Sequence, residues 1–333
     1  MRVLISEAKK KLTDIMATSG ASMKEVHMMV DVMMEYDLHN NTFSGFSGLE
    51  YRRDQLRDSV QKKHKMVVNK PSMKLIDANG RSAILEGVAA VDLVCKMAKK
   101  TGIAMVGIYN ATYHEGMEAY VRKIAALDLI GIVSANGGPA GVVPYCGTKA
   151  IFGTNPIGYG VPSNGLPIVF DAATGKYPYG SIRIARKLKR VLPEASYFDK
   201  EGRLTTDPEK AVAIIPFGEH KGYAINLLLE VMTGTFVRAK SGLSIKSEKD
   251  LGSFFIAIDP SVFVPMKEFK TNVSKLIEEV KAVKPMSGFD AVYIPGHRGE
   301  EAKQRMLKEG YIEIVDYIWK EFEELYKKVV VNN

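Results

Sequence analysis

Short apolar segments alternate with helix-like stretches through the middle of the chain, and this alternation constrains the fold more than any other feature. The apolar runs are short enough to be buried strands. Between the first two lies a helical pattern from about Glu115 to Leu127. Repeated strands and helices in one stretch predict an α/β domain. The strand candidates are Ile103–Tyr109, Leu129–Ser134, Ile168–Asp171, Phe254–Ile258 and Ala291–Ile294.

Both ends of the chain have a helical pattern instead. Ser22 is followed three residues later by Glu25, the spacing of a capping box, and Ser6 is a second predicted N-cap. The tail from Glu300 onward is charged and amphipathic. In contrast, Lys221–Val237 is apolar nearly all round, which predicts a buried helix.

The composition is that of an ordinary globular protein. Of 333 residues, 46% are hydrophobic and 25% are charged, which suffices for a core in one or two domains. No stretch approaches the roughly 18 to 20 apolar residues that span a membrane, and the first residues, MRVLISEAKKKL, lack the apolar region of a signal peptide. Cys95 and Cys146 are the only cysteines, which excludes a disulfide scaffold and a multi-cysteine zinc site. We expect a cytoplasmic protein with no metal and no membrane partner.

The chain is basic, with 46 basic against 38 acidic residues and a net charge of +8. The densest basic runs are Arg183–Arg190 and Lys62–Lys65, and neither is interleaved with aromatic residues. We interpret them as a solvated face, or as a field that attracts anionic metabolites. Nucleic-acid binding is kept as the weaker alternative.

The usual nucleotide and metal motifs are missing. The sequence contains no G-x-G-x-x-G, no Walker-type G-x-x-x-x-G-K-[ST] and no H-E-x-x-H. The nearest candidate is Gly158-Tyr-Gly160, and Pro162 directly after it would disturb a helix start. A nucleotide site, if present, must therefore be built in another way.

Loops rich in glycine, asparagine and proline follow the apolar segments. They are Ser134–Pro139, Gly153–Pro156 and Asp171–Gly175. Loops at strand ends expose backbone N–H groups and small hydroxyls to ligands. Any one of them could be an ordinary turn, but three within about forty residues predict a shared pocket.

The segment Pro216–Gly222 leads into the long apolar helix. A helix N-terminus offers free N–H groups and a partial positive charge, to which Lys221 adds a full charge. This combination suits a pyrophosphate. The ordinary alternative is that Lys221 is a surface lysine.

His114 follows an apolar segment and precedes the helical pattern. Reduction of a carbonyl or imine needs a proton beside the incoming hydride, and histidine is the commonest donor at neutral pH. A nearby helix N-terminus would lower its pKa and favour neutral imidazole. From position alone, a structural role stays open, as it does even more for the remaining histidines. These are His27, His39, His64, His220 and His297.

In order, these loops resemble the type 2 malate/L-lactate dehydrogenase family. The family pattern contains H-[FY]-G, a proline-bearing loop, G-T-N-P, D-x-A-T, T-x-D-P, P-F-G-x-x-K-G, F-x-x-I-x-x-x-x-F and I-P-G. The matching segments are His114–Gly116, Asn136–Pro144, Gly153–Pro156, Asp171–Thr174, Thr205–Pro208, Pro216–Gly222, Phe255–Phe263 and Ile294–Gly296. The resemblance covers nearly the whole chain.

The resemblance implies a homodimer with its active site near the subunit interface. It implies a three-layer α/β/α domain over residues 71–261, with a mixed sheet of the L-sulfolactate dehydrogenase type and not a Rossmann sheet. Residues 1–70 and 262–333 would form a helical lobe. The cofactor would be NAD or NADP. Its implied binding residues are His114, Asn155, Asp171, Ala172, Ala173, Thr174, Lys221, Gly222, Gly296, His297 and Arg298.

The chain departs from the family on the substrate side. Where the family has S-H-G-x-x-R, this chain has Phe43–Gly48, so Ser44 replaces a catalytic histidine and Gly48 a carboxylate-binding arginine. Ser44 donates a hydrogen bond but is no acid near pH 7. Arg52 or Arg53 would have to hold the substrate carboxylate instead. Glu115 stands where the family has an aromatic residue.

The resemblance favours an enzyme that transfers a hydride between nicotinamide and a small 2-oxo or 2-hydroxy acid, or a cyclic 2-imino acid. His114 and Ser44 are the catalytic candidates. The predicted substrate-binding residues are Ser44, Arg52, Arg53, Asn136 and Thr154. The alternative is a degenerate member that binds nucleotide for regulation or assembly.

Overall fold

A seven-stranded mixed sheet forms the centre of the computed structural model, which describes residues 1–41 and 44–332. The strand order is β2-β3-β4-β10-β5-β6-β7, in which β3 and β4 run parallel and the other neighbouring pairs antiparallel. The mixed sheet predicted from the family resemblance is therefore confirmed. The strands are β2 (Lys65–Asn69), β3 (Met73–Asp77), β4 (Ile103–Ala111), β5 (Ile130–Ala135), β6 (Ile157–Val161), β7 (Ile168–Ala172) and β10 (Leu251–Ile258).

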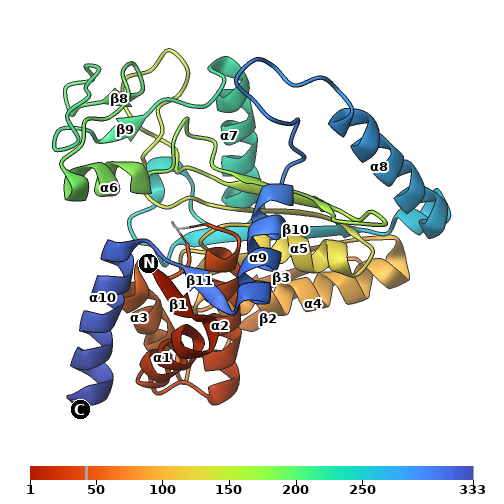
Figure 1. Cartoon of the computed structure of the whole chain (residues 1–333), viewed down its shortest axis with the longest axis horizontal. Helices are drawn as coiled ribbons and strands as arrows, with labels where there is room; N and C mark the ends of the chain where they lie inside the picture. Colours follow the sequence, from red (N-terminus) through yellow and green to blue (C-terminus); the bar gives the residue numbers. More distant parts are fainter. Residues whose placement is uncertain (42–43, 333) are drawn as a thin grey trace.

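Helices cover both faces of this sheet, which gives three layers (Figure 1). On one face lie α4 (Ala83–Thr101) and α5 (Glu118–Ala126), and on the other lies α7 (His220–Thr233). The alternation along β10 shows why: Phe255 belongs to the core under α4 and α5, whereas Phe254 packs in the core on the α7 side. Successive strand side chains point to opposite faces, so a strand covered on both faces is continuously apolar.

The two ends of the chain share a separate hydrophobic core, seen at the lower left of Figure 1. Strand β1 pairs antiparallel with β11, and this pairing brings the terminal helices together. The elements are β1 (Arg2–Leu4), α1 (Ile5–Ala17), α2 (Met23–Leu38), α3 (Leu49–Ser59), α9 (His297–Glu309), β11 (Tyr311–Glu313) and α10 (Asp316–Tyr326). The domain limits at residues 70/71 and 261/262 stay a prediction, and β2 pairs within the large sheet although it precedes residue 71.

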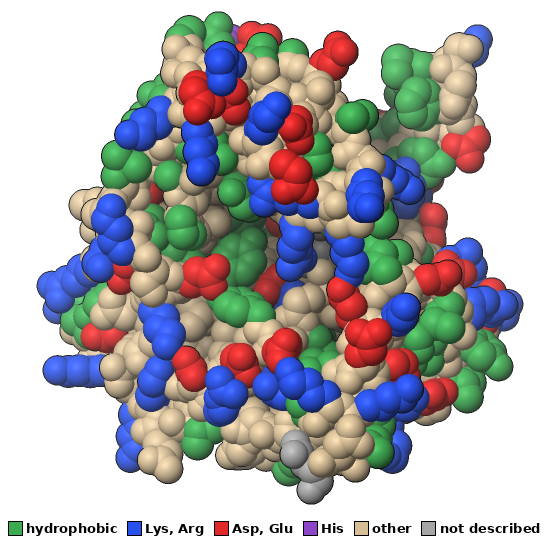
Figure 2. Space-filling model, turned by 90° about the vertical axis from the view of Figure 1, so that its left-hand side faces the viewer, with side chains coloured by type: hydrophobic (Ala, Val, Ile, Leu, Met, Phe, Trp, Pro, Cys, Tyr) green, Lys and Arg blue, Asp and Glu red, His purple; other side chains and the backbone are tan. Residues whose placement is uncertain are grey.

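The remaining elements lie on the α7 side of the sheet. A small unit contains α6 (Gly180–Leu188), β8 (Tyr197–Phe198) and β9 (Ala213–Ile214), and α8 (Met266–Lys281) extends from the body (Figure 1). Figure 2 shows a hollow on the face toward α6, with hydrophobic side chains in its depth and charged side chains around it. In the part of the chain that is described, no helix is long and apolar enough to cross a membrane.

The two predicted N-caps have different outcomes. At Ser22 the capping box is confirmed, because the Glu25 amide donates to Ser22 Oγ and the Glu25 carboxylate accepts from the Ser22 amide. The cap at Ser6 is wrong, since α1 begins at Ile5. There, the Ile5 amide donates to the Gly310 carbonyl at 3.0 Å, so strand pairing and not a side chain fixes the helix start.

Three other expectations are corrected. Ala291–Ile294 is not a strand; the Val169 amide of β7 reaches only the Pro295 carbonyl there, and Pro295 has no N–H to continue a ladder. The helix expected from Glu115 begins only at Glu118. The apolar helix α7 is buried on one face only, which leaves several of its side chains exposed. These are Ile225, Leu227, Leu228 and Val231.

Candidate active site

The predicted strand-end loops lie side by side and are joined by backbone hydrogen bonds. The Thr174 amide donates to the Thr154 carbonyl at 2.8 Å, and the Phe217 amide donates to the Thr174 carbonyl at 3.0 Å. The Gly137 amide donates to Asn155 Oδ1 at 2.9 Å. The loops at 153–156, 171–175 and 216–222 therefore form one surface. The loop at 134–139 is joined to this surface through Asn155. Together with residues 296–298, we call the first three the cofactor side.

Buried side chains of α7 hold two of these loops. Asn155 Nδ2 donates to Asn226 Oδ1 at 2.7 Å and to Glu230 Oε2 at 2.6 Å. Asn136 Nδ2 contacts Glu230 Oε1 at 3.4 Å, and its Oδ1 accepts from the Gly138 amide. Asn136 and Asn155 are thus occupied in positioning the loops, and their ligand-binding roles stay predictions. Glu230 was missed from sequence, although an acid in an otherwise apolar helix was the available signal.

The start of α7 places an exposed lysine beside a buried glycine. A Cβ on Gly222 would lie 1.8 Å from the Phe217 carbonyl oxygen, so the chain turns into the helix in a way only glycine permits. Gly222 is buried, whereas Lys221 is exposed and makes no ion pair with the described chain. The Lys221 and Tyr223 amides already donate to the Gly218 and Glu219 carbonyls, so the unpaired ammonium of Lys221 is the group here that suits a phosphate. The cofactor role of this helix start stays a prediction.

The start of α9 lies beside strand β7, at the end of the strand opposite to the loop at 171–174. Gly296 has a φ of 85°, and a Cβ there would lie 2.7 Å from the Val169 carbonyl oxygen of β7. His297 is buried, and burial lowers its pKa. Arg298 is exposed and lies over the Tyr293 ring, 4.8 Å from its centroid. The loop at 296–298 and the loop at 171–174 therefore bracket β7, whose five residues span about 13 Å in extended form.

His114 lies in the extended segment after β4 and is buried, with 1% of its surface exposed. Its ring packs against Tyr120 and Phe255, with centroids 5.9 and 5.8 Å away. Neither ring nitrogen has a hydrogen-bond partner among the described residues. Burial lowers the pKa of His114 to about 3, so the imidazole is neutral at pH 7. The neutral form was expected, but the helix-end cause was wrong, because α5 starts four residues later.

Asp171 joins the His114 segment to the cofactor side. Its carboxylate accepts from the Met117 amide at 2.8 Å and from the Glu118 amide at 3.2 Å, so it caps α5. Burial raises the pKa of Asp171 to about 7. A Cβ on Gly116 would lie 2.7 Å from this carboxylate. The predicted cofactor role of Asp171 therefore combines with a structural one.

The other residues of the predicted D-x-A-T loop differ in exposure. Ala172 and Ala173 are half-buried and available for contact with a ligand. Thr174 is fully buried, and its Oγ1 donates to the Thr154 carbonyl at 2.8 Å. The backbone of this loop is thereby fixed against the neighbouring loop. Its binding role stays a prediction.

The residue after His114, Glu115, forms a buried ion pair with Arg52. Arg52 Nη2 is 2.9 Å from Glu115 Oε2, with the two side chains 2% and 8% exposed. Arg52 Nε and Nη1 are buried without a partner among the described residues. Arg53 instead pairs with Asp54 at 3.2 Å. Of the two predicted arginines, only Arg52 faces this region. We call residues 44–52 and 113–115 the substrate side.

Ser44 is buried in the turn before α3, and its amide donates to the Asn41 carbonyl at 3.3 Å. Phe43, the first residue of the segment that departs from the family pattern, lies outside the described residues. Sequence reasoning noted Glu115 as a departure but missed its ion pair with Arg52. An acid beside a candidate catalytic histidine was the signal.

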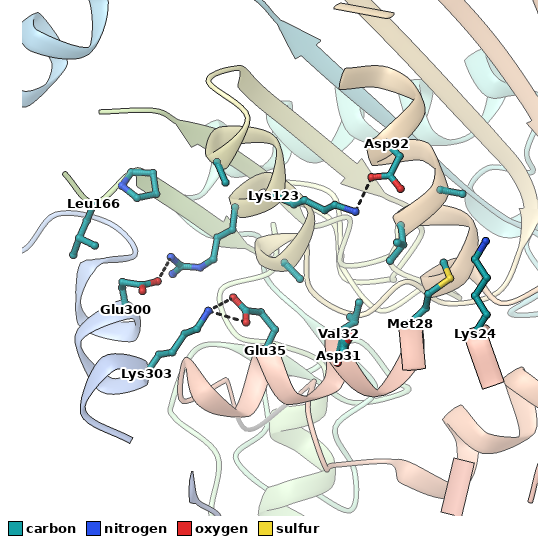
Figure 3. A pocket seen from close by; sticks show the side chains of 16 residues that line it. Lys24, Met28, Asp31, Val32, Glu35, Asp92, Lys123, Leu166, Glu300 and Lys303 are labelled. Atoms are coloured by element: carbon teal, nitrogen blue, oxygen red, sulfur yellow. Dashed lines mark hydrogen bonds and ion pairs between the residues drawn. The ribbon is translucent and has the colours of Figure 1, made fainter. Parts of the chain in front are cut away.

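The large groove in Figure 3 is a different place. It has a volume of about 780 Å³, lies among α2, α4, α5 and α9, and contains none of the predicted site residues. Its ionic groups are largely paired with one another, as for Lys303 with Glu35 and Lys123 with Asp92. Within the described ranges, no cluster of three or more His, Cys, Asp or Glu residues could hold a metal ion.

The fold is a three-layer α/β architecture with several loops gathered at the strand ends. A model of the malate/L-lactate dehydrogenase family matches residues 3–323. The chain therefore belongs to this family and is an oxidoreductase, a dehydrogenase or reductase, as the resemblance predicted.

Named relatives share this family but differ in substrate. The malate/(S)-sulfolactate dehydrogenase of Methanothermus fervidus is 32% identical, with 91% of each chain covered. The ureidoglycolate dehydrogenase (NAD(+)) of Escherichia coli O157:H7 is 30% identical over 75% of this chain and 73% of its own. The Δ1-pyrroline-2-carboxylate/Δ1-piperideine-2-carboxylate reductase of Pseudomonas putida is 29% identical, covering 71% and 70%.

A solved structure agrees with the fold. The sulfolactate dehydrogenase of Methanocaldococcus jannaschii matches with a TM-score of 0.87 at 29% identity, covering 99% of this chain and 97% of its own. The predicted L-sulfolactate dehydrogenase type of fold is confirmed by this likeness.

Proposed function

We propose that this enzyme transfers a hydride between NAD or NADP and a small 2-oxo or 2-hydroxy acid, or a cyclic 2-imino acid. One observation carries the proposal. His114 is buried with both ring nitrogens unpaired, and its segment is joined through Asp171 to the cofactor side and through Glu115 to Arg52. Buried polar atoms without partners are rare, and a bound ligand accounts for them.

The cofactor side fits a nicotinamide dinucleotide. The start of α7, with Lys221 and Gly222, would hold the diphosphate, and the loops at 171–174 and 296–298 would hold the rest of the molecule along β7. When bound, the nicotinamide supplies or accepts the hydride. The relative named for NAD(+) supports this choice of cofactor.

The protein's own groups would then act on the substrate. Neutral His114 donates an N–H hydrogen bond to the carbonyl oxygen or imine nitrogen, and in the oxidative direction it accepts the hydroxyl proton. Arg52 has unpaired N–H donors, at Nε and Nη1, either of which can donate to the carboxylate. The buried position of both groups excludes water and strengthens these contacts. Ser44, Arg53, Asn136 and Thr154 stay predicted contributors.

The direct test is turnover. Purified protein would be mixed with NADH or NADPH and a panel of 2-oxo and cyclic 2-imino acids while nicotinamide absorbance is followed. We expect oxidation of the reduced coenzyme with at least one member of the panel. No turnover across the panel, despite tight coenzyme binding, would contradict the proposal.

A second candidate is a family member that binds nucleotide for regulation or assembly without turnover. Ser44 and Gly48, at the positions of a family histidine and arginine, favour it. The test above separates the two, because this candidate predicts coenzyme binding without reaction. A His114→Ala variant gives a second test. If turnover of a substrate is found and depends on His114, this variant should abolish it. Turnover that persists in the variant would count against a catalytic role for His114.

We also propose that the enzyme is a cytoplasmic homodimer with its active site near the interface. The exposed side chains of α7 support an interface, because Leu227, Leu228 and Val231 are each at least 41% exposed, and contiguous apolar surface marks association sites. A Leu228→Glu variant should sediment as a monomer if this face is buried in the dimer. A wild-type protein that sediments as a monomer would contradict the dimer.

A further inference from the structure

We propose that Glu115 and Arg52 form a paired subsite that selects a substrate bearing one carboxylate and one positively charged nitrogen, as in a protonated cyclic 2-imino acid. The same subsite disfavours 2-oxo dicarboxylates. This inference rests on the proposed function and narrows its substrate class. It concerns a residue, Glu115, to which the family pattern gives no role.

The first support is the incomplete pairing of Arg52. One of its nitrogens, Nη2, lies 2.9 Å from Glu115, whereas Nε and Nη1 are buried without a partner among the described residues. A buried donor that lacks a partner loses its hydrogen bonds to water without replacement and is therefore costly. A purely structural ion pair would be expected to satisfy these donors. A substrate carboxylate would satisfy one of these donors with a charged hydrogen bond, since the N–H bonds of Nε and Nη1 lie on different edges of the guanidinium.

The second support is the space that Gly48 leaves. A Cβ on Gly48 would lie 3.2 Å from Arg52 Nη1, tighter than ordinary van der Waals contact. Gly48 also has a φ of 71°, which side chains rarely adopt. The guanidinium of Arg52 therefore occupies the space into which a side chain at position 48 would extend. The positive charge is retained, but it now comes from the first turn of α3 and reaches Glu115.

The third support is the charge around the pair. Arg52 interacts with Asp37 as well as with Glu115, and burial raises the pKa of Asp37 to about 7. Arg183 attracts Glu115 electrostatically, while Glu248 repels it. Burial raises the pKa of Glu115 as well as that of Asp37, so these two carboxyls are ionised only where a cation lies beside them. A cationic nitrogen on the substrate favours the charged form of Glu115, whereas a second substrate carboxylate would find no cation in excess and is disfavoured by like-charge contact.

A zwitterion meets no such penalty. Its carboxylate pairs with Arg52, and its N–H⁺ donates to Glu115, so that both buried charges gain an opposite partner. Glu115 is held with a φ of 71°, a left-handed conformation that is unfavourable for a residue with a side chain. Strain of this kind is often found where a side chain must be aimed at a ligand.

The pair also fits the chemistry of imine reduction. A protonated imine already carries the proton that a carbonyl needs from an acid. The hydride adds to the imine carbon, and the electron pair of the C=N bond moves to nitrogen, which yields a neutral secondary amine. Glu115 stabilises the cationic substrate and loses this attraction once the charge is gone. His114, neutral at pH 7, need only donate a hydrogen bond.

The test compares substrates of different charge on wild-type enzyme. The probes are Δ1-piperideine-2-carboxylate, pyruvate and oxaloacetate, each with the preferred reduced coenzyme. We expect kcat/KM for the imino acid to exceed that for oxaloacetate by at least about 100-fold, as expected for two favourable charged contacts against one repulsion. A preference for oxaloacetate would overturn the inference without any variant being needed.

Variants then assign the preference to Glu115. Glu115→Gln should raise KM for the imino acid about 10- to 100-fold, as for loss of a charged hydrogen bond. It should therefore reduce the ratio of kcat/KM for the imino acid to kcat/KM for oxaloacetate. Glu324→Gln, the same change at an exposed position of α10 outside the substrate side, is the control. Thermal melting checks that both variants fold. An unchanged ranking in folded Glu115→Gln would contradict the inference, whereas no turnover of any probe by wild-type enzyme would count against the proposed function itself.

Discussion

The cofactor side and the substrate side of the site are built from different parts of the polypeptide. On the cofactor side, backbone hydrogen bonds between Thr154, Thr174 and Phe217 fix the loops. On the substrate side, the side chains of Arg52 and Glu115 define the surface. The loops on the cofactor side are fixed by their backbone and by buried side chains behind it, whereas the chemistry of the substrate side changes with each substitution. Binding of the coenzyme and choice of the substrate can therefore vary separately on one fold.

His114 lies between the two sides, and removing its imidazole has the largest expected effect. Asn at this position keeps a small polar group but cannot exchange a proton. With a 2-oxo or 2-hydroxy acid, whose reaction needs a proton donor or acceptor, we expect His114→Asn to lower kcat/KM by about 10²- to 10⁴-fold, the range for loss of a general acid–base. With a protonated imino acid, which already carries its proton, the loss should be smaller. Coenzyme affinity, measured by calorimetry, should stay near wild type. An equal loss of coenzyme affinity would show that the two sides are not separable.

The glycine at the start of α7 tests whether the cofactor side depends on its backbone. In Gly222→Ala, the new methyl group would meet the Phe217 carbonyl oxygen at 1.8 Å. Relief by backbone movement should destabilise the protein by about 1–3 kcal/mol and weaken coenzyme binding. The matched control is Gly165→Ala, because no atom lies within 4 Å of a Cβ there. If denaturant titration gave the same free energy of unfolding for the two variants, the cofactor side would not depend on the glycine at position 222.

The burial of His114 predicts a pH dependence of stability. Its pKa is about 3 in the folded protein and about 6.5 when unfolded, so between these values the unfolded state binds more protons. Stability from this group is therefore complete above pH 6.5 and is lost as the pH falls. Wild type should lose about 2 kcal/mol more than His114→Asn between pH 7 and pH 5. Parallel curves of unfolding free energy would show that His114 is accessible to solvent.

The smallest effect is expected at the outer edge of the substrate side. Arg183 of α6 donates to Ser47 Oγ at 3.1 Å in an exposed contact. Loss of such a contact changes stability by less than about 1 kcal/mol. Arg183→Gln should leave melting and coenzyme affinity nearly unchanged while altering KM for an anionic substrate. A marked loss of coenzyme affinity would place Arg183 on the cofactor side instead.

The sequence predicted the architecture well because apolar periodicity and loop composition are local signals. The strands at 103–109, 129–134, 168–171 and 254–258 are confirmed to within a few residues. The strand at 291–294 failed, because an apolar run before Pro295 has the right composition but no partner for a ladder. Strand identity there depends on tertiary pairing, which a local pattern cannot report.

The site was predictable only in part, for a related reason. Motif order located the loops, but not that Asn155 is occupied by Glu230 or that Asp171 caps α5. The pairing of Arg52 with Glu115 joins residues far apart in sequence. Such contacts depend on the packing of α3 against the segment after β4. Composition and spacing contain no information about them.

The central claim, that the cofactor side binds a nicotinamide dinucleotide, can be tested through the single tryptophan of the chain. Trp319 stacks on Phe322 in α10, and reduced nicotinamide absorbs where indole emits. Titration with NADH or NADPH should quench Trp319 emission by energy transfer, and the quenching should saturate. Oxidised coenzyme, which does not absorb in this range, should displace the reduced form and restore the emission. Emission that stays unchanged in folded protein at saturating levels of both reduced coenzymes would contradict the account.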